Sequence, residues 1–138
     1  MFERITAFLP RFKEDGYGKP TGGRAGRGAR KNNARQPNFV YSETVREFES
    51  AVFRFVEERE EMRLTDYLGI LGDAGIRPDT DLLKASDVSE YDGQTVMALI
   101  VGSIRAERFC EGALLGAFES GLIQKWLERL IEIDANNR

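Results

Sequence analysis

The sequence contains no histidine and only one cysteine, Cys110. Without histidine, neither a Ser-His-Asp nor a Cys-His catalytic arrangement can form, and no imidazole can act as a base near neutral pH. One cysteine without histidine also speaks against a zinc site. An enzyme built from this sequence would therefore have to rely on carboxylates, a lysine, a tyrosine or a bound cofactor.

The lone cysteine also excludes an internal disulfide, which favours a reducing compartment. The segment from Met1 to Pro10 has only a short apolar run and carries Glu3 near its start. Such a segment is too short and too acidic for a signal peptide or a spanning helix. We therefore expect a cytoplasmic protein that does not associate with membranes.

Acidic residues are missing from Gly16 to Ser42. The rest of the chain carries 14 of the 20 basic residues and all 23 acidic residues, a net charge of −9. The sequence therefore predicts a basic arm on an acidic body. The six cations of the window are Lys19, Arg24, Arg27, Arg30, Lys31 and Arg35.

Length and composition predict one domain over residues 1–138, because 138 residues with 41% apolar and 31% charged side chains can form one core. Apolar spacing from Ile5 to Phe12 predicts a first helix over 3–9, which Pro10 ends or kinks near Leu9. Residues 16–41 then form a predicted Gly/Arg-rich loop between the first two helices.

The second helix is predicted to start after Ser42, a good N-cap, and to run to about Glu61. Thr65 or Asp66 caps a shorter helix that Gly72 or Gly75 stops. Three apolar stripes beyond Gly93 predict three further helices. The stripes are Val96, Leu99, Ile100, Ser103 and Ile104; Phe109, Ala113, Leu114, Ala117 and Phe118; and Ile123, Trp126, Leu127, Leu130 and Ile131.

No segment shows the period of two that is typical of a strand, so the predicted class is all-α with five or six helices. Two glycines within the last helices, Gly112 and Gly116, are interpreted as places where helices approach closely. Gly121 is interpreted as the residue that ends its helix in a left-handed conformation.

The C-terminal third also supports a resemblance to a known family. The segments are Arg105-Ala-Glu-Arg-Phe-Cys-Glu-Gly112, Phe118-Glu-Ser-Gly121 and Trp126-Leu-Glu-Arg-Leu130, together with Phe8-Leu-Pro-Arg-Phe12 near the start. In these segments the sequence resembles a bacterial family of small uncharacterised helical proteins, catalogued as a domain of unknown function. The resemblance implies an all-α fold and a bacterial or phage origin, and it implies no activity. Val101 stands where threonine is expected, and Tyr67 where tryptophan is expected.

The basic arm is the first candidate binding site. Each cation that neutralises a phosphate releases a counterion, and glycines let the backbone follow an irregular groove. The arm itself contains no aromatic residue between Gly22 and Arg35, so only the flanking Tyr17, Phe39 or Tyr41 could stack on bases and binding would be largely independent of sequence. The alternatives are a solvated loop, or an arm that folds back onto Glu57, Glu58, Glu60 and Glu61. The candidate contact residues are Arg24, Arg27, Arg30, Lys31 and Arg35.

The charged segment 105–111 is the second candidate site, with Arg105, Glu107, Arg108, Phe109 and Glu111. In a helix, the carboxylates at 107 and 111 share one face and could hold a magnesium ion. The alternative interpretation is an ion-pair network that sets the angle between two helices.

The leading hypothesis from the sequence is a non-enzymatic interaction protein without catalytic residues, cofactor or bound metal. Its arm would contact an acidic protein surface or nucleic acid. The first alternative is a carboxylate- and metal-dependent enzyme site within 105–111. The second alternative is a structural homodimer.

Overall fold

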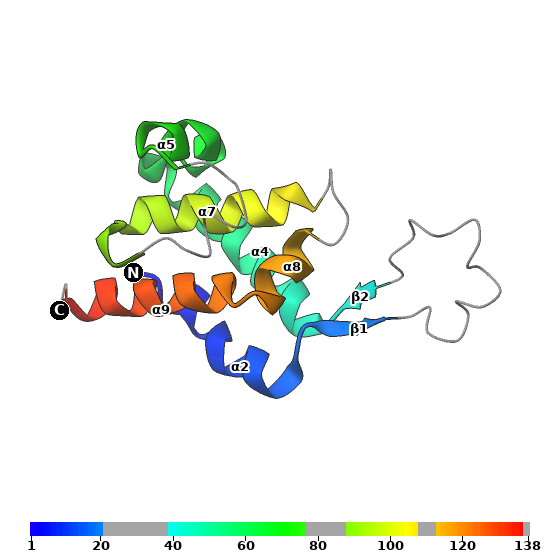
Figure 1. The fold of residues 1–138 in the computed structure, drawn as a ribbon. Coiled ribbons are helices and arrows are strands. Elements are labelled where there is room, and N and C mark those ends of the chain that lie inside the picture. Colours follow the sequence, from blue (N-terminus) through cyan, green and yellow to red (C-terminus); the bar gives the residue numbers. More distant parts are fainter. Residues whose placement is uncertain (21–38, 77–87, 108–112, 137–138) are drawn as a thin grey trace, which may run out of the picture.

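The computed structural model describes residues 1–20, 39–76, 88–107 and 113–136, and these residues are mostly helical, as predicted (Figure 1). The α-helices are α1 (Glu3–Thr6), α2 (Phe8–Asp15), α4 (Glu43–Glu58), α5 (Tyr67–Asp73), α7 (Gly93–Ala106), α8 (Ala113–Glu119) and α9 (Leu122–Asn136). Three single 3₁₀ turns are η1 (Glu60–Met62), η2 (Leu64–Asp66) and η3 (Val88–Glu90).

A short antiparallel pair of strands, β1 (Gly18–Pro20) and β2 (Phe39–Tyr41), corrects the prediction that the chain has no strand. The register places Gly18 opposite Tyr41 and Pro20 opposite Phe39. Strands of three residues are too short to show a period of two, which explains why the pattern missed them. Residues 21–38, the central part of the predicted loop, lie outside the described residues.

The first helix breaks earlier than predicted, at Ala7, and the chain continues as α2 through Pro10 to Asp15. Pro10 is the third residue of α2, where a backbone N–H would have no partner within the helix. Its ring would clash with the carbonyl of Thr6 in a continuous helix, so the proline explains the break. Two helices, and not one, therefore precede β1.

Local capping rules place several boundaries. The Ser42 hydroxyl accepts a hydrogen bond from the Val45 N–H at 3.2 Å and caps α4, as predicted. Helix α4 ends at Glu58 and not near Glu61, because residues 60–62 form the separate turn η1. Asp92 caps α7 by accepting from the Thr95 N–H at 2.8 Å. Gly121 follows α8 with a φ of 87°, which confirms its predicted left-handed conformation.

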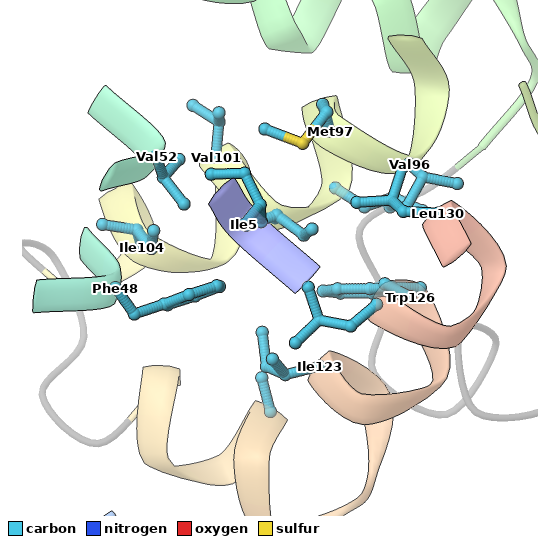
Figure 2. Close-up of a cluster of buried hydrophobic side chains, with 14 of the residues drawn as sticks. Ile5, Phe48, Val52, Val96, Met97, Val101, Ile104, Ile123, Trp126 and Leu130 are labelled. Carbon is cyan, nitrogen blue, oxygen red and sulfur yellow. The ribbon is translucent and has the colours of Figure 1, made fainter. Parts of the chain in front are cut away.

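The core surrounds α7, whose residues from Thr95 to Val101 are all buried. Figure 2 shows Phe48 and Val52 from α4 and Trp126 from α9 pointing toward the same interior as Ile5 of α1. Beside this cluster, the ring of Phe12 meets Phe118 with centroids 4.9 Å apart, and it meets Phe48 at 5.2 Å. Helices from both ends of the sequence thus share one hydrophobic core.

Two predictions about packing are wrong. Ile131 was assigned to the apolar stripe of α9, but it is 44% exposed because it lies at the edge of that stripe. A Cβ added at Gly116 would meet no atom of the described residues within 4 Å, so none of their helices approaches it closely, and Gly112 lies outside the described residues. The close approach occurs at Gly102, where an added Cβ would lie 3.2 Å from the Tyr67 ring. This contact lets α5 pack against α7.

One buried carboxylate joins the start of the chain to α9. Asp134 is 8% exposed, and its side chain accepts a hydrogen bond from the Phe2 N–H at 2.8 Å. The Met1 ammonium donates to the same carboxylate at 3.0 Å. The Phe2 N–H is an uncharged backbone donor, whereas the Met1 ammonium is a cation. A single carboxylate therefore satisfies a buried backbone N–H and also pairs with a positive charge.

We predict that Asp134→Ala lowers the free energy of unfolding by about 2–3 kcal/mol, because it leaves the buried Phe2 N–H without its acceptor. Asp134→Asn should cost less, since an amide oxygen can still accept from that N–H. Urea denaturation measures both values. Asn136→Ala, an exposed change in the same helix, is the control and should be nearly neutral. Equal stabilities for the alanine variant and the wild type would contradict this role.

Candidate functional site

Only the edges of the two candidate sites lie within the described residues. All five cations of the arm lie outside the described residues, and so do Arg108, Phe109 and Glu111 of the charged segment. The structure therefore describes the stem from which the arm starts, and the first part of the charged segment, Arg105 and Glu107.

The stem of the arm is the β1–β2 pair, and it is fastened to the body at its base. The Ser42 N–H donates to the Tyr17 carbonyl at 2.9 Å, and the Ser42 hydroxyl donates to the Gly16 carbonyl at 3.2 Å. The same hydroxyl accepts from the Val45 N–H to cap α4. Ser42 therefore ties both strands of the stem to the start of one helix. Residues 21–38 leave and return to the body at neighbouring points.

Tyr41, the last residue of β2, connects the stem to the charged segment. Its hydroxyl donates to a Glu107 carboxylate oxygen at 3.0 Å and accepts from the Leu115 N–H at 3.0 Å. The same Glu107 oxygen accepts from the Leu114 N–H at 2.9 Å. Burial, followed by the hydrogen bond to Glu107, raises the pKa of the Tyr41 phenol well above its ordinary value. The hydroxyl therefore keeps its proton and remains a donor to Glu107.

A second carboxylate, Glu49 of α4, lies close enough to Glu107 to be affected by its charge. Burial raises the pKa of Glu49, and the negative charge of Glu107 raises it further, while Arg46 opposes the shift. The nearby charge of Glu107 thus favours the protonated form of Glu49, because like charges repel.

Arg105 lies elsewhere, over the ring of Phe53 with its guanidinium carbon 5.7 Å from the ring centroid. Its buried Nε atom has no hydrogen-bond partner among the described residues. Such a position is typical of a cation–π contact that fixes an arginine against a helix. Arg105 and Glu107 thus contact different elements, α4 on one side and β2 with α8 on the other.

Aromatic rings at the base of the arm are already engaged. Tyr17 stacks on Phe118 with centroids 4.7 Å apart, and its hydroxyl accepts a hydrogen bond from the Gln124 amide. Tyr41 is held by Glu107 and Leu115. Sequence reasoning left these two tyrosines available to stack on bases, whereas both rings serve the packing of the body.

The described residues contain neither a metal-binding cluster nor a membrane-spanning helix. Within 1–20, 39–76, 88–107 and 113–136, no group of three or more cysteine or acidic side chains is placed to hold a metal ion. In the same part of the chain, no helix has the length and apolar character needed to cross a membrane.

The fold and the sequence together define a small, predominantly helical domain with a short two-stranded stem. The chain belongs to DUF6508, a family of unknown function, whose model matches residues 1–136. The resemblance drawn from segments 8–12 and 105–130 is thus confirmed for nearly the whole chain. No curated protein matches the sequence, and no solved structure matches the fold.

We predict that Tyr41→Phe lowers the free energy of unfolding by about 1–2 kcal/mol, because it removes a donor to Glu107 and an acceptor for the Leu115 N–H. Urea denaturation measures the loss, and a double-mutant cycle with Glu107→Gln measures the coupling. Tyr91→Phe is the matched control, since the described structure shows no hydrogen bond of the Tyr91 hydroxyl. If the losses in the free energy of unfolding from Tyr41→Phe and Glu107→Gln simply add, the two side chains are not coupled and the proposed contact is contradicted.

The raised pKa of Glu49 predicts a dependence of stability on pH. Its folded pKa lies above its ordinary value, so ionisation of this group destabilises the folded state as pH rises through its titration. Glu49→Gln should therefore raise the free energy of unfolding slightly at pH 7, a small effect because Glu49 is only half buried and solvent screens its charge. The advantage should vanish below the pKa of the unfolded carboxyl. Denaturation at several pH values, with exposed Glu57→Gln as the control, measures this difference.

Proposed function

We propose that this protein is a non-enzymatic binding protein whose basic arm contacts the phosphates of nucleic acid. The observation that carries the proposal is the pairing of β1 with β2, two strands that flank a segment with five cations and no acidic residue. The five cations of residues 21–38 are Arg24, Arg27, Arg30, Lys31 and Arg35.

The charge distribution supports this function. Outside residues 16–42 the chain has a net charge of −9, which repels a polyanion. Favourable contacts with phosphates would therefore concentrate on the arm, which supplies attraction that falls steeply with salt. The stem holds Pro20 and Phe39, the residues on either side of segment 21–38, next to each other.

The engaged tyrosines support a binding mode without base stacking. Because Tyr17 packs on Phe118 and Tyr41 bonds to Glu107, the base of the arm offers phosphate contacts more readily than stacking. Binding that rests on phosphates carries little sequence information. The expected ligand is therefore mixed-sequence DNA or RNA.

The contacts of Glu107 support a structural role for the charged segment. This carboxylate accepts from Tyr41 and from the start of α8, so it is occupied by protein donors that a magnesium ion would have to displace. We therefore favour the binding protein over the magnesium-dependent enzyme as the function of this chain.

Replacement of the five arm cations by serine should abolish binding of labelled mixed-sequence oligonucleotides, measured by fluorescence anisotropy. If all five contact phosphates, the slope of log K against log salt between about 50 and 200 mM should be about −3.5 for single strands and about −4.5 for duplexes. The melting temperature should stay nearly unchanged, because the described core contains none of these residues.

The control variant for this experiment loses five positive charges from the described body and should still bind. Its substitutions to serine are at Lys13, Arg46, Arg54, Arg59 and Arg63. Equal loss of binding in both variants would mean that net charge alone is responsible. No binding of the wild type at low salt would overturn the proposal and turn attention to an acidic protein partner.

A further inference from the structure

A groove of about 720 Å³ runs along one side of α4, where this helix meets α1 and α2. Residues of α4 line it at intervals of three and four, from Glu43 at the first position to Glu58 at the last. This spacing marks one helical face. At 1.5 Å per residue, the face is about 23 Å long, so the groove suits an elongated occupant better than a compact one.

The break at Ala7 shapes the opposite wall of the groove. Because the chain turns there, Arg4 of α1 and Phe8 of α2 both reach the same face of α4. Phe8 and Phe55 are buried and form the apolar floor. In the middle of the α4 side, the lining residues Ser50 and Ala51 have small side chains, which leave room for a side chain of an occupant.

Internal ion pairs cancel part of the charge around the groove. Arg4 pairs with Glu58 at 3.2 Å, and Arg11 pairs with the lining residue Glu47 at 3.1 Å. Arg46 and Arg54 remain: both are exposed, and neither lies within ion-pair distance of a carboxylate of the described residues, while the charge of Arg46 also acts on half-buried Glu49. Arg54 lies eight positions after Arg46 in α4, a rise of about 12 Å.

One more lining charge, Glu43, fixes the polarity of the groove. It lies in the first turn of α4, one turn before Arg46, and it also forms no ion pair with a cation of the described residues. Along α4, the charges that face the groove are therefore negative at Glu43, positive at Arg46 one turn later, and positive at Arg54 about two turns after that. A complementary occupant carries a basic residue, then an acidic residue, then a second acidic residue two turns on.

We propose that this groove binds an amphipathic α-helix of a partner protein, whose two acidic residues pair with Arg46 and Arg54. A basic residue one turn before the first acidic residue faces Glu43. Between the two acidic residues, an apolar side chain of the partner enters the groove at Ser50 and Ala51. This is helix-in-groove recognition, in which apolar contact supplies affinity and charges fix direction.

A synthetic helical peptide tests the proposal. It carries Lys, then Glu three residues later, then a second Glu seven residues further on, with Leu between the two glutamates. Seven residues return to nearly the same helical face. The control peptide has Lys in place of both glutamates. The measurements are fluorescence anisotropy at low salt and the NMR shifts of the Ser50 and Ala51 amides.

The wild type should bind the acidic peptide at least about tenfold more tightly than the control peptide. The double variant Arg46→Glu/Arg54→Glu should reverse this preference, since charge reversal on both partners restores the pairs. Ser50→Trp should block the acidic peptide without changing the charge. The matched control, Lys13→Glu/Arg63→Glu, changes two exposed cations outside the described groove lining and should bind like the wild type.

The variant with five serines in the arm separates this surface from the proposed nucleic-acid contact, because it should bind the acidic peptide normally. Loss of peptide binding in that variant would mean that the arm, and not the groove, holds the peptide. Failure of the wild type to prefer the acidic peptide would overturn the proposal. So would self-association, seen by sedimentation, that disappears in Arg46→Glu/Arg54→Glu, since a second copy would then occupy the groove.

Discussion

The contact between Asp134 and the start of the chain is the constraint on which the arrangement of the helices depends. The carboxylate holds the Phe2 N–H, and this fixes the entry of α1 beside α9. From that position Ile5 is completely buried among core residues, near Trp126 (Figure 2). Without the acceptor, the same burial would leave a backbone N–H unsatisfied, which costs more than the hydrogen bond contributes.

The position of α1 also decides where the second helix can lie. Pro10 forces the break at Ala7, and α2 then turns so that Phe8 and Phe12 reach Phe48 of α4. Phe12 continues the contact to Phe118 of α8. A chain of aromatic contacts thus connects the N-terminal helices with the C-terminal ones, and the stem of the arm begins directly after α2.

Sequence reasoning succeeded where a structure depends on neighbours along the chain. The cap at Ser42 and the left-handed Gly121 follow from short-range rules, and both are confirmed. The buried residues of α9 largely follow from periodicity, although Ile131 at the edge of the stripe is exposed. In α7 the stripe identified only part of the buried set, because Met97, Ala98 and Val101 are buried as well and Ser103 is not. Pro10 misled the prediction because its effect depends on which residue starts the helix.

The contacts that define the candidate site could not be predicted in the same way. Tyr41 and Glu107 are 66 residues apart, and Phe2 and Asp134 are 132 apart. No local pattern marks such pairs, because tertiary packing alone brings them together. The charged segment was recognisable by its residues, but its connection to the stem depends on Tyr41, for which the sequence suggested stacking on bases and no contact with Glu107.

Helix α4 is the element that both proposed surfaces share. Its N-cap, Ser42, holds the stem, and its face toward Glu107 carries Glu49. Another face lines the groove and carries Arg46, whose charge also acts on Glu49. Because the core face of α4 is buried from Thr44 to Val56, the helix cannot turn to favour one surface over the other. A rigid helix therefore holds the stem at its first turn and the charged groove along its flank, so the two proposed contacts use separate parts of one helix and would not compete.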